Sequence, residues 1–128
     1  MKIAIYSRKS KFTGTGESVE NQIQLCKEYA ERHFDNIEEY FIYEDEGYSG
    51  GNIDRPQFQR MLNDAKKKKF DILICYRLDR ISRSVSDFST TIEVLNKHNI
   101  SFISIREQFD TSTPMGRAMM YIASVFAQ

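Results

Sequence analysis

The most constraining feature of this sequence is a regular alternation of short apolar runs with segments of helical periodicity. Strand-like apolar runs occupy residues 2–7, 38–44, 70–76 and 100–105. Apolar residues recur at helical spacing in the segments between and after these runs, at residues 18–33, 56–69, 84–98 and 115–128. A chain that alternates in this way usually folds as a parallel sheet covered by its crossover helices. We therefore predict an α/β domain with a mainly parallel sheet of four to five strands and helices on both faces.

The size and charge of the chain set further limits. Its 128 residues suffice for one hydrophobic core, so we expect a single domain. The formal net charge is zero, which argues against a free-standing nucleic-acid binder because such proteins usually carry a basic excess. The basic residues are unevenly distributed, however, since residues 76–83 read YRLDRISR and hold three arginines. The distribution of charge is therefore a better guide to function than its sum.

Several classes of site and location are disfavoured. Cys26 and Cys75 lie far apart in apolar segments, which predicts buried thiols rather than a disulfide or a metal pair. His33 and His98 fall near the ends of predicted helices, and no group of residues has the spacing of metal ligands. We therefore predict neither a histidine-activated hydrolase nor a bound metal or cofactor. Without a membrane-length apolar run or a signal peptide, the expected location is the cytoplasm.

Polar residues collect where the predicted strands end. The carboxyl ends of parallel strands meet at one edge of the sheet, where ligands bind in such folds. Guanidinium groups remain charged and match two phosphate oxygens, so several arginines at one edge predict a phosphate site. The residues in question are Arg8 and Ser10, then Ser49 and Arg55, then Arg77, Asp79, Arg80 and Arg83, and finally Arg106, Glu107 and Asp110.

The stretch YSRKS, residues 6–10, contains two serines, Ser7 before Arg8 and Ser10 after it. Strand alternation turns Ser7 toward a helix-covered face, which predicts a small packed residue. Ser10 lies beyond the strand end, where its hydroxyl could approach a large substrate. From the residues alone, Ser10 is either a nucleophile on phosphorus or a serine of a turn or helix cap.

Five motifs in this order resemble the catalytic domain of serine site-specific recombinases, the resolvase/invertase family. The initial RKS, the TGTGES stretch and TPMGR are most similar to the large-serine branch, which includes phage integrases and transposon excisionases. The motifs are YSRKS (6–10), SVENQ (18–22), YSGGNIDRPQF (48–58), YRLDRISR (76–83) and TPMGRAMMYIASVFAQ (113–128).

The resemblance implies a transesterification on double-stranded DNA at specific attachment or crossover sites. Ser10 would attack a phosphodiester, leaving a 5′-phosphoserine and a free 3′-hydroxyl, and strand exchange and rejoining would follow without ATP or metal. The family acts as homodimers that assemble into a synaptic homotetramer. The catalytic residues carried over onto this sequence are Ser10, Arg8, Gln22, Ser49, Arg55, Asp79, Arg80 and Arg83.

The implied roles differ among these residues. Arg80 and Arg83 would hold the scissile phosphate. Asp79 would orient an arginine or assist proton transfer to the leaving oxygen, and a salt bridge that only orders the loop is the alternative. Lys9 and Arg77 are interpreted as contacts to the DNA backbone or as surface charges.

The last segment is apolar almost all round from residue 119 to 127, which predicts burial against a partner. It matches the start of the family's long oligomerisation helix. We therefore interpret residues 1–128 as the N-terminal catalytic domain of a longer protein whose C-terminal DNA-binding regions are absent. Two alternatives stay open, namely a non-catalytic module of the same fold that binds phosphate or DNA or mediates oligomerisation, and a small phosphotransferase or nucleotide-binding domain.

Overall fold

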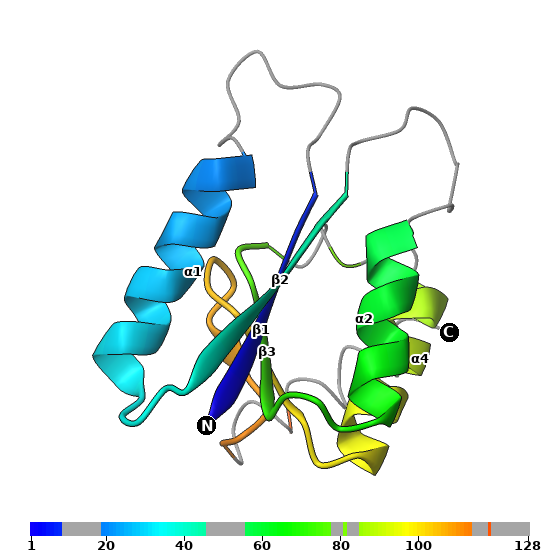
Figure 1. Ribbon diagram of the computed structural model, residues 1–128. Helices are drawn as coiled ribbons and strands as arrows, with labels where there is room; N and C mark the ends of the chain where they lie inside the picture. Colours follow the sequence, from blue (N-terminus) through cyan, green and yellow to red (C-terminus); the bar gives the residue numbers. More distant parts are fainter. Residues whose placement is uncertain (9–18, 46–55, 78–80, 82–84, 114–117, 119–128) are drawn as a thin grey trace.

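The structure is a computed structural model that describes residues 1–8, 19–45, 56–77, 81, 85–113 and 118 (Figure 1). Its centre is a five-stranded sheet with the order β2-β1-β3-β4-β5. The strands are β1 (Lys2–Arg8), β2 (Glu39–Asp45), β3 (Ile72–Cys75), β4 (Ser101–Ser104) and β5 (Phe109–Asp110). β1 pairs in parallel with both β2 and β3, and β3 pairs in parallel with β4, whereas β5 is antiparallel to β4.

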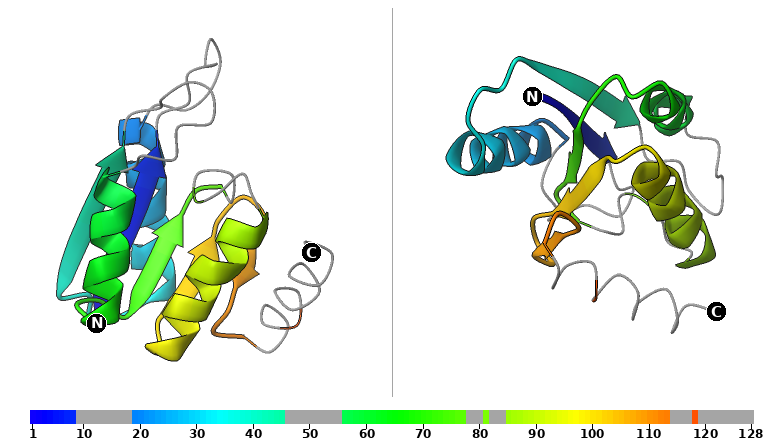
Figure 2. Two further views of the ribbon diagram at one scale, coloured as in Figure 1. Left: turned by 90° about the vertical axis from the view of Figure 1, so that its right-hand side faces the viewer. Right: turned by 90° about the horizontal axis from the view of Figure 1, so that it is seen from below.

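Helices cover both faces of this sheet. α1 (Val19–His33) lies on one face, and α2 (Pro56–Lys66) and α4 (Val85–Lys97) lie on the other (Figures 1 and 2). The α/β fold with a mainly parallel sheet is therefore confirmed, with its strands and helices close to the predicted positions. No described helix has the length and apolar character that a membrane crossing requires. The predicted helix at 115–128 lies almost entirely outside the described residues.

Each face of the sheet has its own hydrophobic layer, because alternate residues of β1 point to opposite sides. Ile3 and Ile5 face α1, and Ala4 and Tyr6 face α2 and α4. Complete burial of an aliphatic side chain of this size contributes about 1.5–3 kcal/mol. The α1 layer also contains Ile23, Cys26, Ala30, Ile72, Ile74 and Ile103. The opposite layer also contains Phe58, Met61, Ala65, Phe70, Leu73, Cys75, Leu95 and Phe102.

The lysine run at residues 66–69 ends α2, and all its side chains are exposed. Lys68 has a left-handed backbone (φ 50°), and the amide of Lys69 donates to the carbonyl of Asp64 at 3.1 Å. This is the Schellman arrangement that closes many helices. The lysines therefore lie at a solvated helix end, as the sequence predicted, on the opposite side of the domain from the carboxyl ends of the parallel strands.

The short strand β5 replaces part of the expected loop after β4. Thr111 fixes it, because the backbone amide of Phe102 donates to the Thr111 hydroxyl at 2.8 Å and the Thr111 amide donates to the Phe102 carbonyl at 3.0 Å. Its two residues are too few to produce an alternating pattern in the sequence. A register of backbone hydrogen bonds, rather than a run of apolar residues, defines this strand.

A buried hydrogen bond between Tyr43 of β2 and Asp64 of α2 links the sheet to its helical layer. The Tyr43 hydroxyl donates to Asp64 Oδ2 at 2.6 Å. Burial and then this bond raise the Tyr43 pKa above its usual range. Burial alone would raise the Asp64 pKa, but the bond from Tyr43 and the charges of Lys69 and Arg60 outweigh it, so this pKa is lowered. The ionised carboxylate is therefore the form that the folded state stabilises.

We expect Tyr43→Phe to lower the free energy of unfolding at pH 7 by about 1–2 kcal/mol, because it removes a hydrogen bond to a charged acceptor. A lowered folded-state pKa contributes stability above the unfolded-state value that is lost as the pH falls through the folded-state value. The difference from the wild type should therefore shrink below about pH 4. Urea denaturation across this pH range measures it.

Tyr40→Phe is the matched control. The Tyr40 hydroxyl is buried and has no hydrogen-bond partner among the described residues. Its removal should leave the free energy of unfolding unchanged or raise it. Equal destabilisation by the two substitutions would contradict the role assigned to the Tyr43–Asp64 bond.

Candidate active site

The parallel strands β1 to β4 all end at one edge of the sheet, which we term the exit edge. The first turns of α1 and α2 begin at this same edge (Figure 1). The structure describes two of the predicted catalytic residues there, Arg8 and Gln22. The other predicted catalytic residues lie outside the described part of the chain, and they are Ser10, Ser49, Arg55, Asp79, Arg80 and Arg83. Their assignments stay predictions.

Arg8 is the last residue of β1. It lies opposite Asp45, the last residue of β2, in the parallel register of these strands. The Arg8 side chain is half-buried, and its Nε atom is fully buried. The backbone at this point is held in a strand pairing, so the position of this arginine is set by the sheet and not by a loop.

Asp45 anchors the exit edge although the sequence interpretation did not single it out. Its side chain is buried, and the Tyr6 hydroxyl donates to Oδ2 at 2.8 Å. The backbone amides of Gln57 and Phe58 donate to Oδ1 and Oδ2, each at 3.0 Å. These amides lie in the first turn of α2 and have no partner within the helix. A carboxylate here accepts their hydrogen bonds and is also favoured by the helix dipole.

The contacts of Asp45 join the two ends of segment 46–55. This segment begins directly after Asp45 and ends directly before Pro56, where α2 begins. Ser49 and Arg55 belong to this segment. The residue before the segment, Asp45, is therefore hydrogen-bonded to the first turn of the helix that follows it. A sequence signal for this was present, because Pro56 suits the first position of a helix whereas Arg55 before it is a poor helix cap.

Ser7 and Gln22 form a second anchor, on the α1 side of β1. Both side chains are buried, with exposed fractions of 0% and 1%. The Ser7 hydroxyl donates to Gln22 Oε1 at 2.9 Å. The expectation that Ser7 packs inside the protein is thus confirmed, and its hydrogen bond to Gln22 is a contact that the sequence interpretation missed. Because Ser7 Oγ is buried and bonded, it is in no position to attack a phosphodiester.

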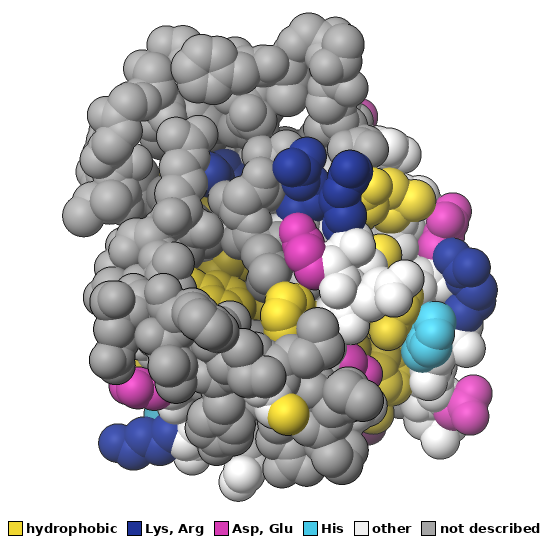
Figure 3. All heavy atoms as spheres, turned by 180° about the vertical axis from the view of Figure 1, so that it is seen from behind, with side chains coloured by type: hydrophobic (Ala, Val, Ile, Leu, Met, Phe, Trp, Pro, Cys, Tyr) yellow, Lys and Arg dark blue, Asp and Glu magenta, His cyan; other side chains and the backbone are white. Residues whose placement is uncertain are grey.

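Basic side chains also mark the ends of β3 and β4. The amides of Ile105 and Arg106 donate to the carbonyls of Cys75 and Tyr76, at 3.1 and 2.9 Å. This bonding prolongs the β3–β4 pairing and brings Arg106 beside the end of β3, where Arg77 follows. Figure 3 shows Lys and Arg side chains gathered in the upper part of the rear face. Such a surface attracts anions.

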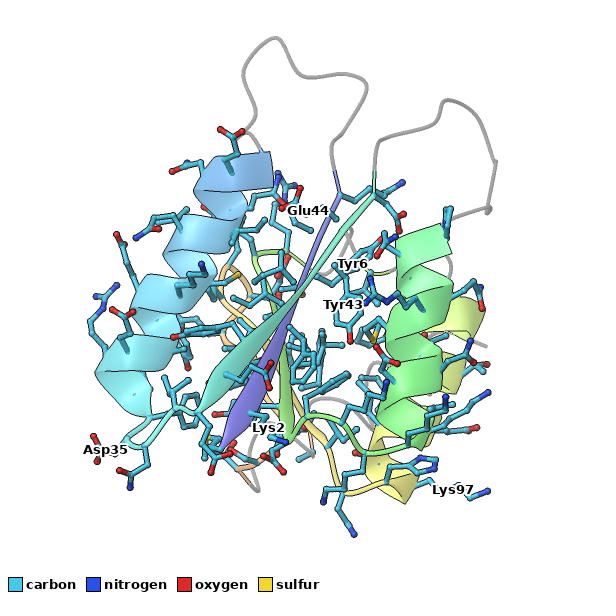
Figure 4. All side chains as sticks on the ribbon, in the orientation of Figure 1. Lys2, Tyr6, Asp35, Tyr43, Glu44 and Lys97 are labelled. Atoms are coloured by element: carbon cyan, nitrogen blue, oxygen red, sulfur yellow. The ribbon has the colours of Figure 1, made fainter. Side chains whose placement is uncertain are left out.

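Glu107, which follows Arg106 in the sequence, has its carboxylate held by a hydroxyl. The Ser104 hydroxyl donates to Glu107 Oε1 at 2.6 Å, across the turn between β4 and β5. Figure 4 shows that Tyr6 and Tyr43, in contrast, point from the sheet toward α2. Two sets of polar contacts therefore lie near the exit edge. One joins Tyr6 and Asp45 to the start of α2, and the other joins Ser104 to Glu107 in the β4–β5 turn.

The two histidines, for which the sequence predicts no catalytic role, lie away from the exit edge. The Nδ1 atoms of His33 and His98 lie 2.9 and 2.8 Å from the carbonyls of Tyr29 and Val94, near the far ends of α1 and α4. Neither cysteine forms a disulfide, both are buried, and burial raises the pKa of Cys26 to about 12. Within the described ranges, no three His, Cys, Asp or Glu residues are grouped as metal ligands.

Comparison with known families and sequences gives a consistent result. The family model described as the resolvase N-terminal domain matches residues 3–128. The transposon Tn917 resolvase of Enterococcus faecalis is 36% identical over 83 residues, which are 65% of this chain and 44% of that protein. The serine recombinase gin of Escherichia phage Mu is 34% identical over 87 residues, 68% of this chain and 44% of that protein. The chain thus spans less than half the length of these two relatives.

Solved structures show the same fold. The N-terminal catalytic domain of TP901-1 integrase superposes with a TM-score of 0.84 and 40% identity, covering 98% of this chain and 93% of that one. A resolvase family site-specific recombinase from Streptococcus pneumoniae superposes with a TM-score of 0.81 and 27% identity, covering 99% of this chain and 85% of that one.

We expect Asp45→Ala to lower the free energy of unfolding by about 2–4 kcal/mol, because it removes a helix cap and leaves the Tyr6 hydroxyl buried without this acceptor. Hydrogen exchange at the amides of Gln57 and Phe58 should quicken more than exchange in the middle of α2. Denaturant unfolding and amide exchange of this chain measure both effects.

Asp35→Ala serves as a control, since Asp35 is exposed between α1 and β2. It should change the free energy of unfolding by less than about 0.5 kcal/mol. If exchange at Gln57 and Phe58 were the same in Asp45→Ala as in the wild type, Asp45 would not be the anchor of α2.

Proposed function

Because this chain belongs to the resolvase/invertase family of serine recombinases, we propose that it forms the catalytic domain of an enzyme that cuts and rejoins DNA at specific sites. In this proposal residues 1–128 constitute the N-terminal catalytic domain. The substrate is double-stranded DNA carrying a crossover or attachment site. Recombination takes place in a homotetramer that two dimers form on the paired sites.

The reaction proposed for Ser10 is an in-line displacement at phosphorus. Ser10 Oγ forms a bond to the phosphorus atom while the bond from phosphorus to the 3′ oxygen breaks. The proton leaves the serine hydroxyl, and the departing 3′ oxygen takes up a proton to become a free hydroxyl. After strand exchange, the 3′-hydroxyl of another strand attacks the 5′-phosphoserine and releases Ser10. The phosphoester bond count is conserved, so no energy source such as ATP is required.

Arginines provide the electrostatic part of this mechanism. Negative charge is spread over the phosphate oxygens in the transition state, and preorganised guanidinium groups stabilise it. We assign Arg8, Arg80 and Arg83 to this task, with Arg55 and Ser49 as further contacts of the phosphate region. Asp79 orients an arginine or assists protonation of the leaving oxygen.

The single observation that carries the proposal is the hydrogen bond between Ser7 and Gln22 at the exit edge. It joins the end of β1 to the first turns of α1, and these two elements flank the segment 9–18 in the sequence. Ser10 belongs to that segment and follows Arg8 by two residues. The contact supports a site at the exit edge in which Arg8 and Gln22 lie at the two ends of the segment that carries the nucleophile.

The covalent intermediate is the direct test. We expect the full-length protein to form an adduct with a nicked duplex that carries the sequence it selects from a random DNA library. The adduct should survive denaturation, form in the presence of EDTA and map to Ser10 by mass spectrometry. Ser10→Ala should abolish it, whereas Ser7→Ala should still form it.

Other outcomes would reject parts of this proposal. An adduct on Ser7 or Ser49, or one that needs magnesium, would contradict the assignment of the nucleophile or of the metal-free reaction. DNA binding or tetramer formation without any adduct would favour a non-catalytic module of the same fold. A nucleotide that raises the melting temperature would favour the phosphotransferase alternative.

We expect Arg80→Ala to lower the rate of adduct formation roughly a thousandfold, the usual effect of removing an arginine that stabilises a phosphoryl-transfer transition state. Circular dichroism and the melting temperature should stay those of the wild type. Arg32→Ala, at the exposed far end of α1, is the matched control and should cleave normally. An Arg80→Ala protein that failed to fold would indicate a structural role instead.

A further inference from the structure

Arg106 has a fixed backbone position at the exit edge. Its amide donates to the carbonyl of Tyr76 at 2.9 Å, which places the residue beside the end of β3. In the turn that follows, the Gln108 amide donates to the Ile105 carbonyl at 3.3 Å, and Gln108 has a left-handed backbone with φ 59°. The antiparallel pairing of β4 with β5 joins the two sides of this turn. The sheet therefore determines where the Arg106 side chain begins.

A row of arginines crosses the sheet at this edge. The last residues in the parallel register of β1 with β3 and of β3 with β4 are Tyr6, Cys75 and Ser104. An arginine follows each of these residues by two positions, namely Arg8, Arg77 and Arg106. Neighbouring strands are about 4.8 Å apart, so the row extends over about 10 Å from the end of β1 to the end of β4. That length is greater than one phosphate group and suits successive phosphates of a nucleic-acid backbone.

The guanidinium at the β4 end of this row is available to a ligand. The Arg106 side chain is exposed, and among the described residues it takes part in no ion pair or side-chain hydrogen bond. Glu107, the next residue, accepts a hydrogen bond from the Ser104 hydroxyl at 2.6 Å. Asp110 accepts one from the Ser112 amide at 2.9 Å. A guanidinium stays charged, and its planar set of N–H donors matches the oxygens of a phosphate.

We propose that Arg106 binds a phosphate of the DNA backbone other than the one that is cut. It forms the far end of the row that starts at Arg8, where the scissile phosphate is held. This inference rests on the proposed function, because the row contacts DNA in this way only if cleavage takes place at the exit edge. Arg106 touches neither the nucleophile nor the scissile phosphate, so it contributes to DNA affinity and not to the chemical step.

Removal of the Arg106 charge should weaken DNA binding and its dependence on salt. One phosphate contact that releases a counterion is worth roughly fivefold in affinity at about 0.15 M salt. We expect Arg106→Gln to lose this factor for each bound subunit and to lower the slope of log K against log salt by about one. Arg106→Lys should keep most of the slope. Fluorescence anisotropy of the full-length protein on the selected duplex, over a range of salt concentrations, measures both quantities.

Lys67→Gln is the matched control. It removes the same charge from an exposed side chain at the end of α2, on the side of the domain opposite the exit edge. Affinity and salt slope should stay almost unchanged, because charges farther apart than about 8 Å are largely screened at this salt concentration.

Neutral methylphosphonate linkages, placed one at a time in the duplex, locate the contact on the DNA. One linkage other than the scissile one should weaken binding of the wild type about fivefold and leave binding of Arg106→Gln unaffected. On the nicked duplex, Arg106→Gln should need more protein to reach half of its maximal rate of adduct formation, whereas the maximal rate itself should fall less than about twofold.

Each outcome decides a different point. A wild-type salt slope in Arg106→Gln, or an equal loss of affinity in Arg106→Gln and Lys67→Gln, would overturn the contact and leave the recombinase function intact. A contact that maps to the scissile linkage, or a lower maximal rate with unchanged affinity, would also overturn it, because Arg106 would then act on the cut phosphate. Absence of any adduct with the wild-type protein would reject the proposed function, and with it the distinction between cut and uncut phosphates.

Discussion

The parallel pairing of β1 with both of its neighbours is the constraint on which the rest of this structure depends. It places β1 between β2 and β3, inside the sheet, and brings the ends of β1, β2, β3 and β4 to one edge. Arg8 and Arg106, which are almost a hundred residues apart in the sequence, therefore belong to the same edge of the molecule. An antiparallel arrangement of the same strands would send half of these groups to the opposite edge.

Two buried polar contacts secure that edge, one on each face of the sheet. Asp45 binds Tyr6 and the start of α2, and Ser7 binds Gln22 of α1. Both contacts begin from consecutive residues of β1, Tyr6 and Ser7, which alternate between the faces. Directly before Arg8, β1 is thus linked to α1 through Ser7 and to α2 through Tyr6 and Asp45, and these links hold the end of β1 between the two helical layers.

Much of this arrangement follows from the sequence, and the parts that do not follow have a physical reason. Strand alternation places Ser7 inside the protein, and the order of strands and helices predicts the parallel sheet. The partners of Asp45 and Ser7 are not predictable in the same way, because they depend on which turn of a helix meets which strand residue. The strand β5 is also not predictable from the sequence, because its two residues are too few to show an alternating pattern. The predicted catalytic residues outside the described part of the chain are assigned by motif and stay predictions.

The anchoring of segment 46–55 at both ends by Asp45 has a consequence for how such a protein can diversify. When the two ends of a connection are already held together, a longer connection costs only the logarithm of its length, about 0.6 kcal/mol for each doubling. Insertions between these ends leave β2 and α2 in place. Because Asp45 holds β2 and α2 together, changes in segment 46–55 need not alter the packing of these two elements. New contacts to a substrate can therefore be acquired in this segment without a change in the sheet.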